Sequence, residues 1–146
     1  MQDVFRAISE VVKKHITKQE SRRLWLKNAA GRTVIISLAS DPDVSVEEII
    51  NDQPHRKVAI EIKGGTDVSN AHNRAGEAEK SHTKAKHKGF RDFWTIISKK
   101  GIEMAKLEAE SRTTTLWFDA AEVLARSGRD WEEFRARLAG ETGIPL

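Results

Sequence analysis

Residues 57–63, KVAIEIK, alternate between polar and apolar side chains along most of their length. A period of two is typical of a β-strand that buries one face and exposes the other. The large apolar side chains then point into a core, whereas Glu61 and Lys63 leave the opposite face side by side. Gly64 and Gly65 follow directly and end the strand. The chain must therefore fold around a sheet that carries a carboxylate and an ammonium group on one face.

The rest of the chain predicts helices and strands in alternation. Apolar side chains recur at helical spacing from about residue 3, so we expect a first helix that continues to about residue 27. The other expected elements are strands at 33–38, 43–50 and 57–63, a long polar helix from Ser69 to Lys88, a strand at 93–97, a helix at 101–111, a strand at 113–118, and helices at 119–125 and 130–139. This order predicts an α/β protein with a mixed central β-sheet flanked by helices.

At 146 residues the chain has the length of one domain, and its composition removes several classes of function. Cysteine and tyrosine are absent, which excludes disulfides, zinc–thiolate sites, thiol catalysis and tyrosine nucleophiles. No apolar run approaches the roughly 18–20 residues that span a bilayer, and the N-terminus has no signal-peptide pattern. We therefore expect a cytoplasmic protein that does not contact a membrane.

Positive charge is concentrated in the middle of the chain. Residues 55–100 carry 11 Lys and Arg against 5 Asp and Glu, whereas residues 1–54 carry 8 of each and residues 101–146 carry 6 against 9. A basic segment of this kind predicts a surface for a polyanion. A solvated helix face is the alternative interpretation, and charge alone favours neither.

The strand that precedes Glu61 brings a second carboxylate toward it. We expect a turn at residues 51–54, and a register that sets Asp43 opposite Glu61 also sets Ile49 opposite His55. Two converging carboxylates bind a hard divalent cation such as Mg²⁺, and a lysine beside them can orient or deprotonate a water molecule. The alternative is an exposed strand face with a simple cross-strand Glu–Lys pair.

The pair Pro42-Asp43, followed on the next strand by Glu61-Ile62-Lys63, resembles the motif of the PD-(D/E)xK nuclease superfamily. The resemblance covers residues 1–120 and implies a restriction-endonuclease-like core. The stretch from Val58 to Phe90, followed by the letters DFWTII, is more particularly similar to type II restriction endonucleases of the XcyI kind.

The resemblance also implies a chemistry for these residues. It implies Asp43 and Glu61 as ligands of Mg²⁺, the Ile62 carbonyl as a further ligand, and Lys63 as the base that positions water. The reaction implied is hydrolysis of phosphodiester bonds in double-stranded DNA, which leaves a 5′-phosphate and a 3′-hydroxyl.

Four other acids are candidates for auxiliary roles. Many members of the superfamily add a first-helix glutamate to the metal site, and Glu10 and Glu20 both qualify. Glu77 and Glu79 lie on the expected polar helix, where pairing with a lysine or arginine of the same helix is the preferred interpretation.

The expected helix from Ser69 to Lys88 is the natural element to face DNA. Lysines on it can neutralise phosphates, and Asn73 and Arg74 are of the types that hydrogen-bond adenine and guanine edges. The nucleic-acid-binding candidates are Asn70, His72, Asn73, Arg74, Lys80, Ser81, Lys84 and Lys88. For any one of them, a solvated helix position is the alternative.

Aromatic and histidine side chains are expected to be structural. The tryptophans lie among apolar neighbours, which favours core packing over base stacking. They are Trp25, Trp94, Trp117 and Trp131. His72 and His82 have no partner at metal-ligand spacing, so a histidine metal site is not favoured.

The sequence thus predicts a Mg²⁺-dependent DNA endonuclease in one domain of residues 1–146. A structure-specific or repair nuclease of the Holliday-junction-resolvase kind and a non-catalytic DNA-binding module are the alternatives. Recognition of a DNA sequence requires either a homodimer, whose second copy completes the site, or further protein if this chain is the catalytic part of a longer one.

Overall fold

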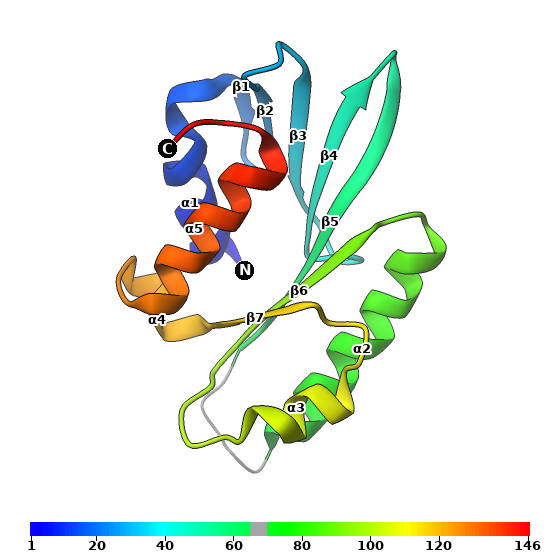
Figure 1. Ribbon diagram of the computed structural model, residues 1–146, viewed down its shortest axis with the longest axis vertical. Helices are drawn as coiled ribbons and strands as arrows, with labels where there is room; N and C mark the ends of the chain where they lie inside the picture. Colours follow the sequence, from blue (N-terminus) through cyan, green and yellow to red (C-terminus); the bar gives the residue numbers. More distant parts are fainter. Residues whose placement is uncertain (65–69) are drawn as a thin grey trace.

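In the computed structural model, which describes residues 1–64 and 70–146, seven strands form one sheet in the order β1 to β7 (Figure 1). The strands are β1 (Ile16–Glu20), β2 (Arg23–Lys27), β3 (Thr33–Leu38), β4 (Val44–Ile50), β5 (Gln53–Lys63), β6 (Asp92–Ile97) and β7 (Leu116–Asp119). Strands β1 to β5 pair antiparallel, and β5, β6 and β7 pair parallel. The predicted mixed sheet is therefore confirmed.

Helices cover both faces of this sheet (Figure 1). They are α1 (Gln2–Val12), the short η1 (Lys13–His15), α2 (Ala71–His87), α3 (Met104–Glu110), α4 (Ala120–Ala125) and α5 (Arg129–Thr142). In the described part of the chain, none of them is long and apolar enough to cross a bilayer. The predicted α/β class with flanking helices is confirmed.

The main core lies between the sheet and the layer of α1, α4 and α5. Val58 and Ile60 of β5 enter it, as their alternation with polar residues predicts. Trp94, Phe118 and Phe134 meet edge to face at its centre, with ring centroids 5.1–5.9 Å apart. Helices α2 and α3 cover the other face, where small clusters around Ala59 and Ile97 are buried.

The prediction of a first helix that continues to residue 27 is wrong. Helix α1 ends at Val12, and residues 16–27 contain the hairpin of β1 and β2. Leu24 and Leu26 are fully buried in the main core, whereas Arg23 and Lys27 are exposed, which is the period of a strand. As a strand, this segment places Leu24 and Leu26 on the side of the sheet that faces the main core.

The turn between β4 and β5 is shorter than predicted. Asn51 and Asp52 both have positive φ values, 51° and 62°, as a two-residue hairpin turn requires. Gln53 and Pro54, assigned to the turn from the sequence, begin β5 instead. The predicted N-cap Ser69 and the strand-ending Gly65 lie outside the described residues.

The tryptophans are core residues with one exception. Trp94 and Trp131 are buried in the main core, and Trp117 packs against the cluster under α3. Trp25 instead points away from the main core, half-buried on the outer face of β2. The Nζ atom of Lys18 lies 4.5 Å from the centroid of its ring. The expectation of a core role is therefore wrong for Trp25.

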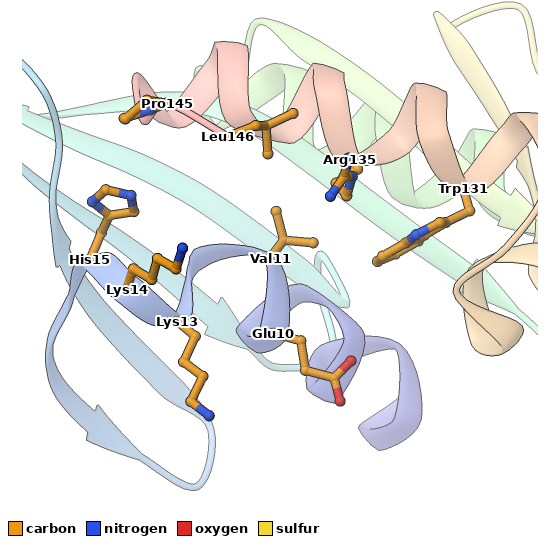
Figure 2. A pocket seen from close by; sticks show the side chains of 9 residues that line it. All are labelled: Glu10, Val11, Lys13, Lys14, His15, Trp131, Arg135, Pro145 and Leu146. Carbon is orange, nitrogen blue, oxygen red and sulfur yellow. The ribbon is translucent and has the colours of Figure 1, made fainter.

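The helical layer leaves a hollow of about 310 Å³ between α1, η1 and α5 (Figure 2). Its lining residues are Glu10, Val11, Lys13, Lys14, His15, Trp131, Arg135, Pro145 and Leu146. This hollow lies on the side of the main core, whereas Glu61 and Lys63 leave the opposite face of the sheet. Neither of those two residues lines it.

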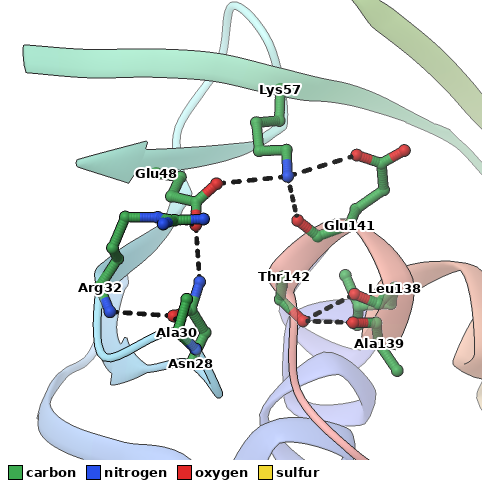
Figure 3. A network of polar contacts seen from close by, with 9 residues as sticks. All are labelled: Asn28, Ala30, Arg32, Glu48, Lys57, Leu138, Ala139, Glu141 and Thr142. Carbon is green, nitrogen blue, oxygen red and sulfur yellow. Dashed lines mark hydrogen bonds and ion pairs between the residues drawn. The ribbon is translucent and has the colours of Figure 1, made fainter. Parts of the chain in front are cut away.

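A buried carboxylate, Glu48 of β4, ties the sheet to α5 (Figure 3). Its oxygens accept hydrogen bonds from Asn28 Nδ2 (2.6 Å), Arg32 Nε (2.8 Å) and Lys57 Nζ (3.4 Å). Lys57 also donates to the Glu141 carbonyl of α5 at 2.7 Å. Burial alone would raise the pKa of Glu48, but these hydrogen bonds and charges lower it below its usual value.

We expect Glu48→Gln to lower the free energy of unfolding at neutral pH by about 1–3 kcal/mol, because the Lys57 and Arg32 charges lose their buried partner. A lowered pKa means that the carboxylate stabilises the fold above its unfolded-state pKa and loses that effect as the pH falls. Urea denaturation at neutral and at acid pH measures both effects. The exposed control Glu133→Gln, which removes the Arg137 pair, should change stability by less than about 0.5 kcal/mol. Equal stability of Glu48→Gln and the wild-type protein at neutral pH would contradict the argument.

Candidate active site

The pairing of β4 with β5 places the predicted site. Val44 pairs with Ile60 and Val46 with Val58, in the predicted register. An irregularity after Val46 shifts the remaining pairs by one residue, so the predicted pairing of Ile49 with His55 is wrong. Ile49 pairs with Pro54 because Lys57 is an extra residue in β5, a β-bulge.

Asp43 directly precedes β4 and lies beside the end of β5. Its Oδ2 atom accepts a hydrogen bond from the backbone N–H of Ile62 at 2.9 Å. The residue is 8% exposed, and its negative charge acts on the Glu61 carboxyl. The structure thus brings Asp43 and Glu61 together, with the backbone of Ile62 between them.

Glu61 is the most unusual titratable group of this cluster. It is 1% exposed, and within the described residues its Oε1 atom has no hydrogen-bond partner. Burial, and then the charge of Asp43, raise the pKa of the Glu61 carboxyl to about 8, against the opposing effect of Lys63. The positive charge of Lys63 thus does not offset the effects of burial and of Asp43 on Glu61. Two carboxylates with such an excess of negative charge favour a divalent cation.

Lys63 joins β5 to α2. Its Nζ atom lies 3.8 Å from Oε2 of Glu61 and 3.7 Å from Oε2 of Glu77. Its side chain is 18% exposed, so the amine can meet a ligand from solvent while it stays beside Glu61. For Glu77 the expected partner on its own helix is wrong, because Glu77 pairs with Lys63 on the sheet.

Helix α2 lies close to the sheet because its buried positions are small. Ala71, Ala75, Ala78 and Ala85 recur at helical spacing and let the helix approach β5 and β6. The stripe next to this buried one contains Arg74, Glu77, Ser81, Lys84 and Lys88.

That stripe faces the elements that carry Asp43 and Lys63. Lys84 Nζ lies 3.8 Å from the Asp41 carboxylate, and Lys88 Nζ donates to the Asp41 carbonyl at 2.9 Å. Glu77 contacts Lys63, as described above. Of the other predicted DNA-binding residues, Arg74 and Ser81 are half-buried and Asn70, His72, Asn73 and Lys80 are exposed.

A chain of buried polar groups runs beneath this cluster, and the sequence analysis missed it. Thr95, which pairs with Glu61 across β5 and β6, bonds His82 Nε2 at 2.9 Å and Thr114 Oγ1 at 2.8 Å. Thr114 bonds Ser111 at 2.7 Å. Burial lowers the pKa of His82 to about 4, so its ring is neutral at physiological pH.

Glu79 ends this chain of polar groups. It accepts hydrogen bonds from Ser111 Oγ, the Thr113 N–H and the Thr113 hydroxyl at 2.7–3.1 Å. The expected pairing of Glu79 with a lysine or arginine of its own helix is therefore wrong. The members of this network lie on α2, on β6 and in the segment before β7, far apart in the sequence, so no local sequence pattern indicates it.

Neither candidate glutamate near the N-terminus joins the pair. Glu10 binds Arg126 at 2.6 Å on the side of the main core, and Glu20 ends β1, an edge strand four positions from β5. Among the described residues, no group of three or more His, Cys, Asp or Glu side chains could hold a metal ion. Asp43 and Glu61 therefore form a pair of acidic side chains without a third one of these residue types beside them in the described part of the chain.

A mixed sheet that presents Glu61 and Lys63 on β5, with Asp43 beside them at the start of β4, has the arrangement that the PD-(D/E)xK resemblance implies. The profile of the XcyI restriction endonuclease family matches residues 1–145. The chain therefore belongs to the XcyI restriction endonuclease family.

Two curated relatives cover nearly the whole chain. It is 40% identical over 143 residues to the type II restriction enzyme XcyI of Xanthomonas campestris pv. cyanopsidis. It is 39% identical over 142 residues to the type II restriction enzyme Cfr9I of Citrobacter freundii. Each match covers 97% of this chain and 43% of the relative, so the chain spans less than half the length of these enzymes. No solved structure matches the chain.

We expect Glu61→Gln to stabilise the metal-free protein at alkaline pH. Because the pKa of Glu61 is raised to about 8, the folded state favours the protonated carboxyl, and stability is lost as the pH rises from the usual carboxyl range toward 8. A neutral glutamine avoids that loss, so the variant should exceed the wild-type protein by at least about 1 kcal/mol above pH 8. The two should be nearly equal at acid pH.

Urea denaturation in EDTA across this pH range measures the difference. Glu48→Gln is the matched control, because it replaces another buried glutamate of the same sheet and should change stability in the opposite direction. A Glu61→Gln variant that is less stable than the wild-type protein at every pH would refute the electrostatic account of this pair.

We expect Thr95→Val to lower the free energy of unfolding by about 1–3 kcal/mol, because His82 Nε2 and Thr114 Oγ1 would each lose a buried hydrogen bond, although Thr114 keeps its bond to Ser111. Thermal and urea denaturation measure the loss. The control Thr17→Val, at an exposed position of β1, should cost less than about 0.5 kcal/mol. Similar values for the two variants would show that the polar chain adds nothing to stability.

Proposed function

We propose that this chain is the catalytic domain of a Mg²⁺-dependent type II restriction endonuclease that hydrolyses double-stranded DNA in the cytoplasm. The observation that carries the proposal is the cluster of Asp43, Glu61 and Lys63 at the end of β5, in a member of the XcyI family. Residues 1–146 would form one nuclease domain.

The residues present fit a hard cation. Asp43, Glu61 and the Ile62 carbonyl would hold Mg²⁺ through oxygen ligands, which this ion prefers. Among the described residues the Oε1 atom of Glu61 has no hydrogen-bond partner, and the pKa of that carboxyl is raised; both support the assignment, because a cation would satisfy both. When bound, Mg²⁺ lowers the pKa of a ligated water and offsets negative charge on the phosphate.

The other protein groups at the site would orient Asp43, hold the attacking water and position Lys63. The Ile62 N–H holds Asp43 by its Oδ2 atom, and the Oδ1 atom of the same carboxylate would act as the ligand. Lys63 can hold the attacking water by hydrogen bonds and stabilise negative charge that develops on the phosphate. Glu77, whose side chain is 64% exposed, pairs with the amine of Lys63 and would help to keep Lys63 at the site.

We assign the DNA contacts first to the flank of α2 that faces this cluster. Arg74, Ser81, Lys84 and Lys88 lie there, and a phosphate would compete with Asp41 for the two lysines. Asn70, His72, Asn73 and Lys80 would extend the surface along the same helix. A homodimer would supply two such sites for the two strands of a palindrome.

We expect the purified chain to cleave supercoiled plasmid in Mg²⁺, and Asp43→Asn, Glu61→Gln and Lys63→Ala each to lower the rate by about 100-fold or more. Gel analysis of the products measures this, with EDTA as the metal-free blank. Glu141→Gln is the matched control, because it removes a half-buried carboxylate on α5, on the far side of the sheet. It should cleave at the wild-type rate.

The products also separate the alternatives. Discrete fragments support a restriction enzyme, whereas nicking or preference for branched DNA would indicate a structure-specific or repair nuclease. Binding of DNA without EDTA-sensitive cleavage by the wild-type chain would overturn the catalytic proposal and leave a DNA-binding module.

A further inference from the structure

The outer side of the first three strands shares a face of the sheet with the candidate active site. Arg23 of β2 pairs with Ser37 of β3, Ser37 with Ser45 of β4, and Ser45 with Ala59 of β5. Directly paired residues point to the same face, as do residues two apart on one strand. Arg23 therefore points to the same side as Ala59, and so as Glu61 and Lys63, which follow at steps of two.

This side of β1 and β2 carries an aromatic ring between two cations. Lys18 Nζ lies 4.5 Å and Arg23 Cζ 5.7 Å from the centroid of Trp25, within the range of cation–π contact. Arg23 Nε also donates to Ser37 Oγ at 3.2 Å. Lys18 and Arg23 remain exposed, and Trp25 is half-buried. We call Lys18, Arg23 and Trp25 the β1–β2 face.

The β1–β2 face has the charge and position for DNA. Lys27 points to the same side, as does one acid of this hairpin, Glu20, so cations are in excess. Strand β2 is three positions from β5, which corresponds to about 14 Å at the usual strand spacing. Each base pair advances about 3.4 Å along the axis of a DNA duplex, so a duplex whose axis crosses the strands, with its reacting phosphate at Glu61, would meet Arg23 about four base pairs away.

We propose that the β1–β2 face binds the phosphates of the substrate duplex on the side of the active site opposite α2; this rests on the proposed function. Lys18 and Arg23 neutralise phosphates, and Trp25 holds both cations in place before DNA arrives. The duplex then lies across the outer face of β1 to β3, with the α2 flank along its other side.

The test compares Lys18→Ala/Arg23→Ala with the wild-type chain in binding a labelled duplex, followed by fluorescence anisotropy in EDTA over a range of salt concentrations. Loss of two phosphate contacts should weaken affinity at least about 10-fold and reduce the slope of log K against log salt by about 1.8. In Mg²⁺ the same variant should raise the KM for plasmid cleavage and leave kcat within about twofold.

Two matched variants control for net charge and for folding. Lys13→Ala/Arg137→Ala removes two exposed cations on the helical side of the sheet and should bind as the wild-type chain does. Lys18→Arg/Arg23→Lys keeps both charges and should keep the salt slope. Circular dichroism melting establishes that each variant is folded. If the alanine double variant does not fold, the proposal rests on the charge-keeping variant and on single Lys18→Ala and Arg23→Ala substitutions, each expected to reduce the slope by about 0.9.

Each outcome decides the assignment. Wild-type affinity and slope in Lys18→Ala/Arg23→Ala, with cleavage by the wild-type chain intact, would overturn this inference and leave the proposed function standing. A wild-type chain that neither binds nor cleaves duplex DNA would overturn both. If sedimentation shows a changed oligomeric state in the variant while affinity per protomer is unchanged, the face is a contact between copies of the chain and the inference is wrong.

Discussion

The pairing of β4 with β5 determines where the two carboxylates of the candidate site meet. Asp43 precedes the first paired residue of β4, and Glu61 follows the last corresponding residue of β5. A shift by one residue would turn Glu61 into the main core and carry Asp43 away from it. The bulge at Lys57 absorbs the extra residue of β5 before the site, so the register next to Asp43 stays intact. The same bulge brings Lys57 to Glu48, and the irregularity that protects the site also ties the sheet to α5.

Two buried glutamates of this sheet show how differently a fold can treat the same group. Glu48 is surrounded by Asn28, Arg32 and Lys57, and its pKa is lowered despite burial. Glu61 is as deeply buried but has Asp43 beside it and only Lys63 to oppose that charge, and its pKa is raised. Glu48, which has a structural role, is stabilised by hydrogen-bond donors and cations of the chain itself. Glu61 has less such compensation, so its ionised form lowers the stability of the fold. A loss of stability of this kind is typical of functional sites, and a cation bound from solvent would reverse it.

Local features of the structure are predictable from the sequence, whereas contacts between distant segments are not. The alternation of residues 57–63 predicted correctly which side of the sheet Glu61 and Lys63 leave, because strand period is a local property. The β1–β2 hairpin was taken for helix, since its few apolar residues fit both periods until the sheet exists to select one. The partner of Glu77 was not predictable, because it depends on how closely the alanines let α2 approach β5. Trp25 was assigned to the core for a similar reason: composition does not tell which side of a strand faces solvent.

The two faces of the sheet differ in composition, because one packs against the main core and the other carries the candidate active site. The face toward α1, α4 and α5 is mostly apolar from β2 to β7, apart from the buried Glu48 of β4, and it holds the aromatic cluster of the main core. The other face is covered by α2 and α3 near β5 and β6, where alanines keep α2 close, whereas the outward side chains of β1 to β3 are exposed or half-buried. If α2 covered the whole face, Glu61 and Lys63 would be sealed from any macromolecule. If nothing covered it, Glu61 would be solvated and its pKa would return toward its usual value. The electrostatic gain from binding a cation between Asp43 and Glu61 would then be smaller. A partly covered face satisfies both needs, because it buries the carboxylates and still leaves a duplex room to reach them.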